Sequence, residues 1–293
     1  MAHKFILYNV KEGVATITFN RPEKRNAINW PMRKEIVGAL KESEANDDVK
    51  VVIIKGAGTA FCSGYDISPV PPGKPHLLES PTGVVVSKKL DRLAGMSAMS
   101  LLADWRTIWD LLKPVIAQVH GYCLAGGWEL AAMCDLRIVA EDAQIGSPIQ
   151  RVIGVGHLHH HPWILGLTKA KEMLLTGHAM SGAEAVEWGW ANHAYPKDKL
   201  DEEVFALAQR MATIPSEVLM LSKRACNRSM EIMGMQTSID CMVDLFTLQS
   251  LRPGGEDFFD RSREVGLKAA LEERDTPFAD FRATRRRTTS RKQ

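Results

Sequence analysis

The chain has 293 residues, of which 45% are hydrophobic and 25% charged, as expected of a soluble globular protein with a sizeable core. Its formal net charge of +2 argues against a dedicated binder of polyanions. Five widely spaced cysteines with no CxxC pair predict reduced core thiols. Without a leader-like start or a bilayer-length apolar run, we expect a cytoplasmic protein that binds neither nucleic acid nor membrane.

The front of the chain alternates strand-like and helix-like segments. Two strand-like runs at 5–10 and 14–19 flank Lys-Glu-Gly and predict a β-hairpin. A charged loop follows, and then Pro31 begins a helix. Its apolar spacing predicts four buried side chains: Met32, Ile36, Val37 and Leu40. The wholly apolar run at 51–54 predicts a strand that is covered on both faces.

A glycine-rich loop at 55–67 leaves that buried strand. It carries neither a Walker lysine nor a GxGxxG pattern, so its sequence does not favour a nucleotide phosphate. Residues 68–100 are rich in proline and then in methionine, which predicts a long insertion or lid. A helix is predicted at 101–112, with Trp105 on its apolar face.

The stretch from 114 to 135 is the most suggestive of chemistry. An apolar strand and a His-Gly turn lead to Gly126 and Gly127, which precede a helical run carrying Glu129. Paired glycines at a helix start leave first-turn N–H groups accessible, and the helix dipole there favours negative charge. This turn suits a developing oxyanion. The alternative is an ordinary strand-to-helix connection, in which Glu129 simply favours the dipole.

The back of the chain becomes helical. A strand is predicted at 136–140, and a run with four histidines occupies 157–161. No acidic or cysteine ligand accompanies these histidines, so we predict no metal site. Helices are predicted at 168–175, 182–187, 199–213, 216–233, 239–250 and 257–273.

Several separated motifs resemble the crotonase family, the enoyl-CoA hydratases and isomerases. The specific ones are Ser-Gly-Tyr-Asp-Ile at 63–67 and Ala-Gly-Gly-Trp-Glu-Leu-Ala at 125–131. Ile-Thr-Phe-Asn-Arg-Pro at 17–22, Asn-Ala at 26–27 and Leu-Leu-Thr-Gly at 174–177 keep the family's order. The resemblance runs from residue 5 to about 278, excluding the insertion at 68–100 and the tail.

The resemblance implies an α/β fold, a crotonase-like spiral of ββα units with a C-terminal helical region that forms trimers, often paired as hexamers. It divides the matched part of the chain into a core at 1–200 and a helical region at 201–281. The basic residues that crowd positions 282–293 predict a disordered, solvated tail there. The implied substrate is an acyl-CoA, with coenzyme A as part of the substrate and no tightly bound cofactor. The thioester oxygen would lie between the backbone N–H groups of Tyr65 and Gly126.

The CoA arm, by the same resemblance, would follow the loop near Arg25 and the backbone that leads into Tyr65. Lys24, Arg25 or Lys55 would meet phosphates, although each is otherwise an ordinary solvated charge. Phe278 would approach the adenine from a neighbouring subunit. The implied CoA-binding residues are Lys24, Arg25, Ala27, Ala60, Ser63, Gly64 and Phe278.

The chain departs from the family pattern at the second catalytic carboxylate. A family hydratase uses two glutamates, and Glu129 matches the first. Ile149 or Gln150 stands where the second is expected, and neither transfers a proton. Arg151 would bind a substrate carboxylate, pair with Glu129 or face solvent. His157, the first histidine of the 157–161 run, is a candidate acid–base partner.

The sequence is compatible with three functions. The leading one is a CoA-thioester enzyme of the hydratase/isomerase type, a lyase or isomerase of fatty acid metabolism with Glu129 as principal acid–base residue. The second is a crotonase-fold C–C bond hydrolase that uses histidines on a diketone without CoA. The third is an inactive binding or scaffold homologue.

Overall fold

The computed structural model describes residues 3–68, 78–79, 85–86, 96–152, 154, 156, 158–251 and 257–278. A six-stranded sheet in the order β1-β2-β3-β6-β8-β11 forms its centre. β1 and β2 are antiparallel, and every other neighbouring pair in this sheet is parallel. The strands are β1 Ile6–Lys11, β2 Val14–Phe19, β3 Val51–Gly56, β6 Val115–Val119, β8 Leu136–Ala140 and β11 His193–Tyr195.

Two smaller sheets lie apart from the central one. The first has the order β10-β9-β7 and the second joins β4 to β5. Because β7 follows β6 directly and precedes the helix carrying Glu129, the first small sheet positions the start of that helix. These strands are β4 Leu78–Glu79, β5 Val85–Val86, β7 Tyr122–Leu124, β9 Gln144–Gly146 and β10 Met180–Ser181.

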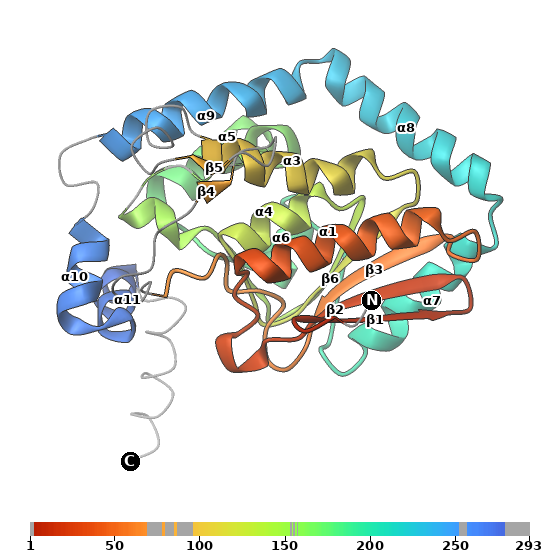
Figure 1. Cartoon of the computed structure of the whole chain (residues 1–293), viewed down its shortest axis with the longest axis horizontal. Helices are drawn as coiled ribbons and strands as arrows, with labels where there is room; N and C mark the ends of the chain where they lie inside the picture. Colours follow the sequence, from red (N-terminus) through yellow and green to blue (C-terminus); the bar gives the residue numbers. More distant parts are fainter. Residues whose placement is uncertain are drawn as a thin grey trace.

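Helices cover both faces of the central sheet, with α1 and α7 on opposite sides, while α8 and α9 run across the top of the view (Figure 1). α10 and α11 form a separate pair at one end. The helices are η1 Pro22–Lys24, α1 Trp30–Ala45, α3 Met96–Asp110, α4 Gly126–Met133, η2 Pro148–Arg151, α5 His161–Thr176, α6 Gly182–Glu187, α7 Leu200–Ala212, α8 Ser216–Ile232, α9 Met235–Leu251, α10 Asp257–Val265, α11 Leu267–Asp275 and η3 Thr276–Phe278.

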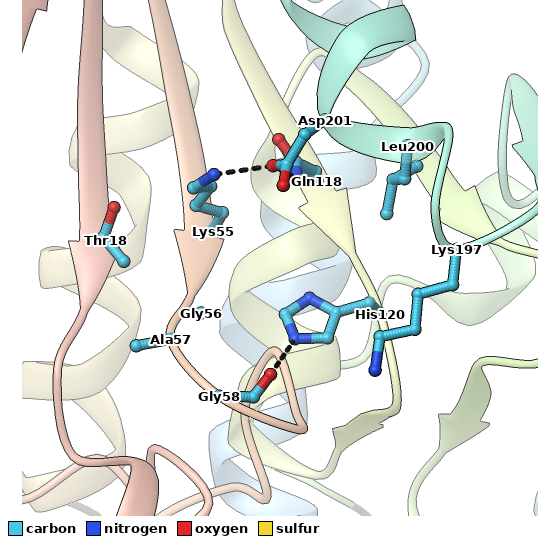
Figure 2. A pocket seen from close by; sticks show the side chains of 10 residues that line it. All are labelled: Thr18, Lys55, Gly56, Ala57, Gly58, Gln118, His120, Lys197, Leu200 and Asp201. Atoms are coloured by element: carbon cyan, nitrogen blue, oxygen red, sulfur yellow. Dashed lines mark hydrogen bonds and ion pairs between the residues drawn. The ribbon is translucent and has the colours of Figure 1, made fainter.

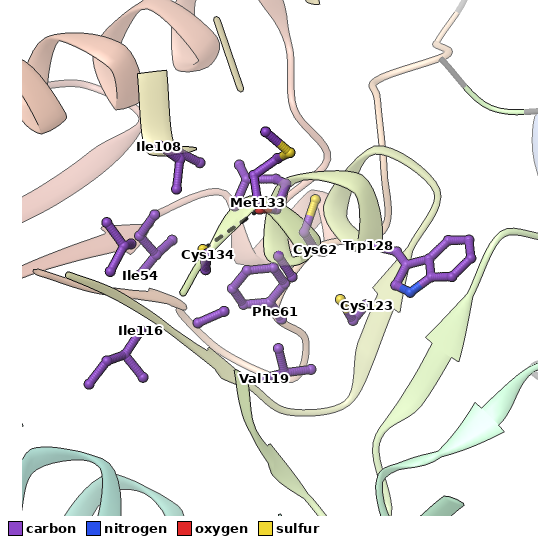
Figure 3. Packing of buried hydrophobic residues seen from close by; sticks show 14 of the residues in the cluster. Ile54, Phe61, Cys62, Ile108, Ile116, Val119, Cys123, Trp128, Met133 and Cys134 are labelled. Carbon is purple, nitrogen blue, oxygen red and sulfur yellow. Dashed lines mark hydrogen bonds between the residues drawn. The ribbon is translucent and has the colours of Figure 1, made fainter. Parts of the chain in front are cut away.

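The hydrophobic core lies between the sheet and the helices above it. Figure 3 shows Phe61 among aliphatic side chains from β3, β6 and α3, with Trp128 to one side, next to Cys123. Burial raises the pKa of the Cys62 thiol to about 12, so this thiol stays protonated. The predicted core thiols are confirmed for Cys62, Cys123 and Cys134, but Cys226 and Cys241 are exposed on α8 and α9.

The predicted elements largely match the structure. The hairpin is confirmed, and all four side chains predicted to be buried on α1 are buried. The single helix predicted at 257–273 is wrong, because Gly266 has φ +83° and separates α10 from α11. α3 begins at Met96, inside the predicted insertion.

Most of that predicted insertion, and all of the tail at 282–293, lie outside the described residues. The boundaries at 200 and 281 stay predictions. No helix in the described part of the chain meets the length and hydropathy expected of a membrane span by itself, although α7 and α8, bent by 106°, meet the criterion as a pair.

Candidate active site

The turn that begins α4 requires both of its glycines. Ala125 precedes the helix with φ 47° and ψ −117°, a strained conformation for a residue with a side chain. A Cβ on Gly126 would lie 2.6 Å from the Tyr65 ring, and one on Gly127 would lie 2.6 Å from the Cys62 Cβ. Both positions therefore exclude any side chain, and the first turn of α4 packs directly against the 62–65 segment.

The loop carrying Tyr65 is held against Ile28 by its backbone. Ile28 N–H donates to Gly64 O at 2.8 Å, and Asp66 N–H donates to Ile28 O at 2.9 Å. Because peptide groups alternate in direction along an extended segment, the Tyr65 N–H is directed away from Ile28. Gly64 lies beside the start of α4, since a Cβ on it would be 3.5 Å from the Gly126 nitrogen. The structure thus brings together the two predicted backbone donors.

The side chains of three residues form a hydrogen-bonded chain within this site. The Trp105 Nε1–H donates to the Tyr65 hydroxyl oxygen at 2.9 Å. The Tyr65 hydroxyl and Glu129 Oε2 are hydrogen-bonded at 2.7 Å. Burial, followed by the charge of Glu129, raises the pKa of Tyr65 well above its usual value, so the phenol is neutral. The sequence did not predict the contact between the Tyr65 hydroxyl and Glu129, and it placed Trp105 only on an apolar face.

Glu129 itself is 3% exposed on a fully buried helix. Its Oε1 accepts a long hydrogen bond from Leu158 N–H at 3.4 Å. A Cβ on Gly156 would lie 2.5 Å from the same oxygen. Gly156 and Leu158 therefore approach one carboxylate oxygen, while Tyr65 holds the other. No sequence signal indicates the roles of Gly156 and Leu158, because both depend on tertiary approach.

Arg151 differs from what the sequence predicts. Its side chain is 0% exposed and pairs with Asp275 at 3.0 Å, which corrects the solvent-facing alternative. Arg151 also donates to Gly177 O at 2.6 Å and lies 4.1 Å from the centre of the Phe278 ring. These contacts hold the Arg151 side chain in a buried network. Its catalytic role stays a prediction. Phe278 is 39% exposed beside it.

The histidine run packs mainly into the core where it is described. His160 and His161 are buried, with ring centroids 5.2 Å and 4.0 Å from that of Trp128. Burial lowers the pKa of His160 to about 3 and that of His161 well below its usual value. Both rings are therefore neutral packing groups near pH 7. His157, the predicted acid–base partner, lies outside the described residues.

Two segments predicted to bind CoA, 24–27 and 60–64, are joined by hydrogen bonds. Ser63 N–H donates to Arg25 O at 3.0 Å, and Ser63 Oγ–H donates to Lys24 O at 3.3 Å. The Arg25 guanidinium lies 5.1 Å from the Tyr122 ring centre. Buried Asn26 joins the loops by donating from Nδ2 to Ala60 O at 2.7 Å. Ala27 and Gly64 lie in the same pair of segments, so the structure brings these predicted residues together.

A separate cavity of about 280 Å³ lies between the carboxyl ends of β2, β3 and β6 and the start of α7. Figure 2 shows His120 hydrogen-bonded to Gly58 O at 3.1 Å, and Lys55 turned to Asp201 at 2.6 Å. Lys55 is therefore paired with a carboxylate, and this contact disfavours the predicted binding of a phosphate. The lining residues are Thr18, Lys55, Gly56, Ala57, Gly58, Gln118, His120, Lys197, Leu200 and Asp201.

Comparisons with known proteins agree with this architecture. The family model described as enoyl-CoA hydratase/isomerase matches residues 9–281. A probable enoyl-CoA hydratase of Rhizobium meliloti is 32% identical over 260 residues, covering 87% of this chain and 94% of that protein. A crotonyl-CoA hydratase of Syntrophomonas wolfei is 31% identical over 288 residues, covering 95% and 99% of the two chains.

Solved structures give the same result for the fold. An enoyl-CoA hydratase/isomerase from Xanthobacter autotrophicus Py2 superposes with a TM-score of 0.83 at 33% identity, covering 94% of this chain and 99% of that one. An enoyl-CoA hydratase from Mycobacterium smegmatis has the same TM-score at 32% identity, with 94% and 95% covered. The crotonase-like α/β fold predicted from the sequence is confirmed.

Proposed function

We propose a function for this chain from the family to which it belongs, the enoyl-CoA hydratase/isomerase family. The chain processes an acyl-CoA thioester through an enolate intermediate, with coenzyme A carried by the substrate. The observation that supports this most directly is the buried Glu129 carboxylate beside Gly126 and the Tyr65 loop. The thioester carbonyl binds between the N–H groups of Tyr65 and Gly126.

Glu129 is the principal acid–base residue in this proposal. Its carboxylate takes a proton from the carbon next to the thioester carbonyl, or from a carbon that is linked to this carbonyl through the conjugated double bond. The electron pair of the broken C–H bond moves towards the carbonyl oxygen and forms the enolate. The two N–H donors then stabilise the oxyanion, and one such donor typically contributes about 3–4 kcal/mol. Returning the proton to another carbon moves the double bond, whereas adding water requires a second group to position it.

Isomerisation is therefore the reaction we favour over hydration. By the family resemblance, Ile149 or Gln150 stands where the second glutamate is expected, and neither carries an ionisable group. The relatives are named hydratases, so both reactions belong in the test. Supplying 3-enoyl-CoA and 2-enoyl-CoA in parallel, and following double-bond migration and water addition separately, distinguishes the two.

We propose that the CoA arm runs along Lys24, Arg25 and Ala27 and then past Ala60, Ser63 and Gly64. The contacts between Ser63 and the backbone of Lys24 and Arg25 support a single surface. Self-association into a trimer or hexamer is also proposed. It is supported by exposed large apolar side chains on the C-terminal helices, namely Val218, Leu221, Ile232, Leu245 and Leu248. Light scattering coupled to gel filtration measures that state.

The decisive variant is Glu129→Gln, which keeps the shape of the side chain and removes its proton exchange. We expect turnover of enoyl-CoA to fall by about 10²-fold or more. Glu202→Gln, at an exposed position of α7, is the matched control and should retain full turnover. Unchanged turnover in Glu129→Gln rejects the mechanism. If the natural protein turns over no acyl-CoA and calorimetry shows no CoA binding, the diketone hydrolase or the scaffold takes its place.

A further inference from the structure

We propose that the side chain of Tyr65 is a positioning residue that holds Glu129 ionised and correctly oriented. This inference rests on the proposed function, because it assigns Glu129 the work of a base. It adds a role for the phenol to the role proposed for the Tyr65 backbone N–H. The hydrogen bond of 2.7 Å between the Tyr65 hydroxyl and Glu129 Oε2 is the primary observation.

The direction of that hydrogen bond follows from Trp105. An indole N–H is a donor only, so the 2.9 Å contact from Trp105 Nε1 uses the Tyr65 oxygen as acceptor. The single phenol proton is then available to Glu129 Oε2. A carboxylate that accepts such a bond is stabilised in its charged form. The pair thus favours a base that is ready to take a proton.

The packing of Tyr65 restricts the position of its hydroxyl relative to Glu129. Its ring lies against Gly126, where a Cβ would be 2.6 Å from the ring, and this contact limits the ring's movement. Trp105, which is 0% exposed, holds the hydroxyl end. The phenol therefore spans the distance from the first residue of α4 to the carboxylate that α4 carries.

The two carboxylate oxygens are held unequally. Oε2 accepts the short bond of 2.7 Å from Tyr65, whereas the bond that Oε1 accepts from Leu158 N–H is long, at 3.4 Å. Because the weaker contact gives way more easily, Oε1 is the oxygen that exchanges protons with the substrate. Tyr65 fixes the plane of the carboxylate and so selects that oxygen.

The first test is Tyr65→Phe, which keeps the ring and removes the hydroxyl. Losing a hydrogen bond to a charged carboxylate typically raises its pKa by about one to two units. The acid limb of the pH profile of kcat/KM should therefore move to a pH about one unit higher. We expect kcat to fall about tenfold with KM changed less than twofold. In a Glu129→Gln background, the same change should have almost no effect on kcat.

Two further variants complete the set. Trp105→Phe removes the donor to the phenol oxygen and should move the acid limb in the same direction by a smaller amount. Tyr8→Phe removes a hydroxyl on β1 that contacts Ser43 of α1, and it should leave kcat and the pH profile unchanged. A Tyr65→Phe profile that superposes on the natural one overturns the proposal.

An activity-independent measurement separates this inference from the proposed function. Infrared difference spectra of the natural protein against Glu129→Gln isolate the Glu129 carboxyl band. In Tyr65→Phe, the protonated band should appear at a pH about one unit higher than in the natural protein. An identical titration in both proteins rejects the positioning role. A shifted titration without acyl-CoA turnover keeps that role and rejects the proposed function.

Discussion

Asp275 and Arg151 form a buried ion pair of 3.0 Å that connects the end of α11 to η2. Asp275 is 2% exposed and also pairs with Arg274, at 2.7 Å and 2.9 Å from its two oxygens. One carboxylate therefore serves two guanidinium groups. Through Gly177, which accepts from Arg151, the contact extends to the end of α5.

Replacing Asp275 with Asn should destabilise the protein strongly. The substitution removes the carboxylate that both arginines share, and removing one member of a buried ion pair typically costs about 3–5 kcal/mol. Urea denaturation followed by circular dichroism measures the change. Glu273→Gln is the control, because its ion pair with Arg261 is on the surface and its loss should leave the midpoint unchanged. Equal midpoints for all three proteins would contradict the prediction.

Gly156→Ala should impair turnover without unfolding the protein. The new Cβ would lie 2.5 Å from Glu129 Oε1, so the carboxylate must move. Displacing a catalytic group by about 1 Å costs on the order of 10²-fold in rate, and we expect kcat/KM to fall by that order. Gly38→Ala is the control, since nothing lies within 4 Å of that position in α1. Full activity in Gly156→Ala would show that the carboxylate tolerates the new methyl group.

Acid should destabilise the fold through the buried histidines. Burial lowers the pKa of His160 to about 3 and that of His161 well below its usual value. The unfolded chain, with an ordinary histidine pKa near 6.5, therefore binds protons first as the pH falls. Their contribution to stability is complete above about pH 7, and each histidine loses about 1.4 kcal/mol per pH unit below about pH 6.

Free energies of unfolding at pH 7.5, 6.5 and 5.5 measure this slope. His161→Phe keeps an aromatic ring against Trp128 and should reduce the slope of the free energy of unfolding against pH. His193→Gln, at an exposed position, should leave that slope unchanged. A free energy of unfolding that is constant across this range would refute the assignment.

Features set by local sequence pattern were predictable. The buried face of α1 follows from apolar spacing, and the turn before α4 follows from the paired glycines at Gly126 and Gly127. The likeness of separated motifs to a known family added the fold, which the superposed structures confirm. In these cases neighbouring residues carry the information.

Features that depend on tertiary approach were not predictable. Trp105 looks like any apolar helix residue until α3 brings its N–H to Tyr65. Asp275 looks like a surface acid at a helix end, yet it meets Arg151 from 124 positions away. Gly266 is a single residue within a helical pattern, and its positive φ breaks the helix. The partners of Trp105 and Asp275 both lie far from them in the sequence.

Asn26 has a consequence for engineering the enzyme. Its amide accepts from Arg21 N–H and donates to the carbonyls of Ala57 and Ala60, so two loops share one buried side chain. A grafted loop that replaces residues 21–27 alone would leave the carbonyls of Ala57 and Ala60 without this hydrogen-bond donor. Attempts to transfer substrate preference between relatives should therefore exchange both loops as a unit, with the asparagine retained.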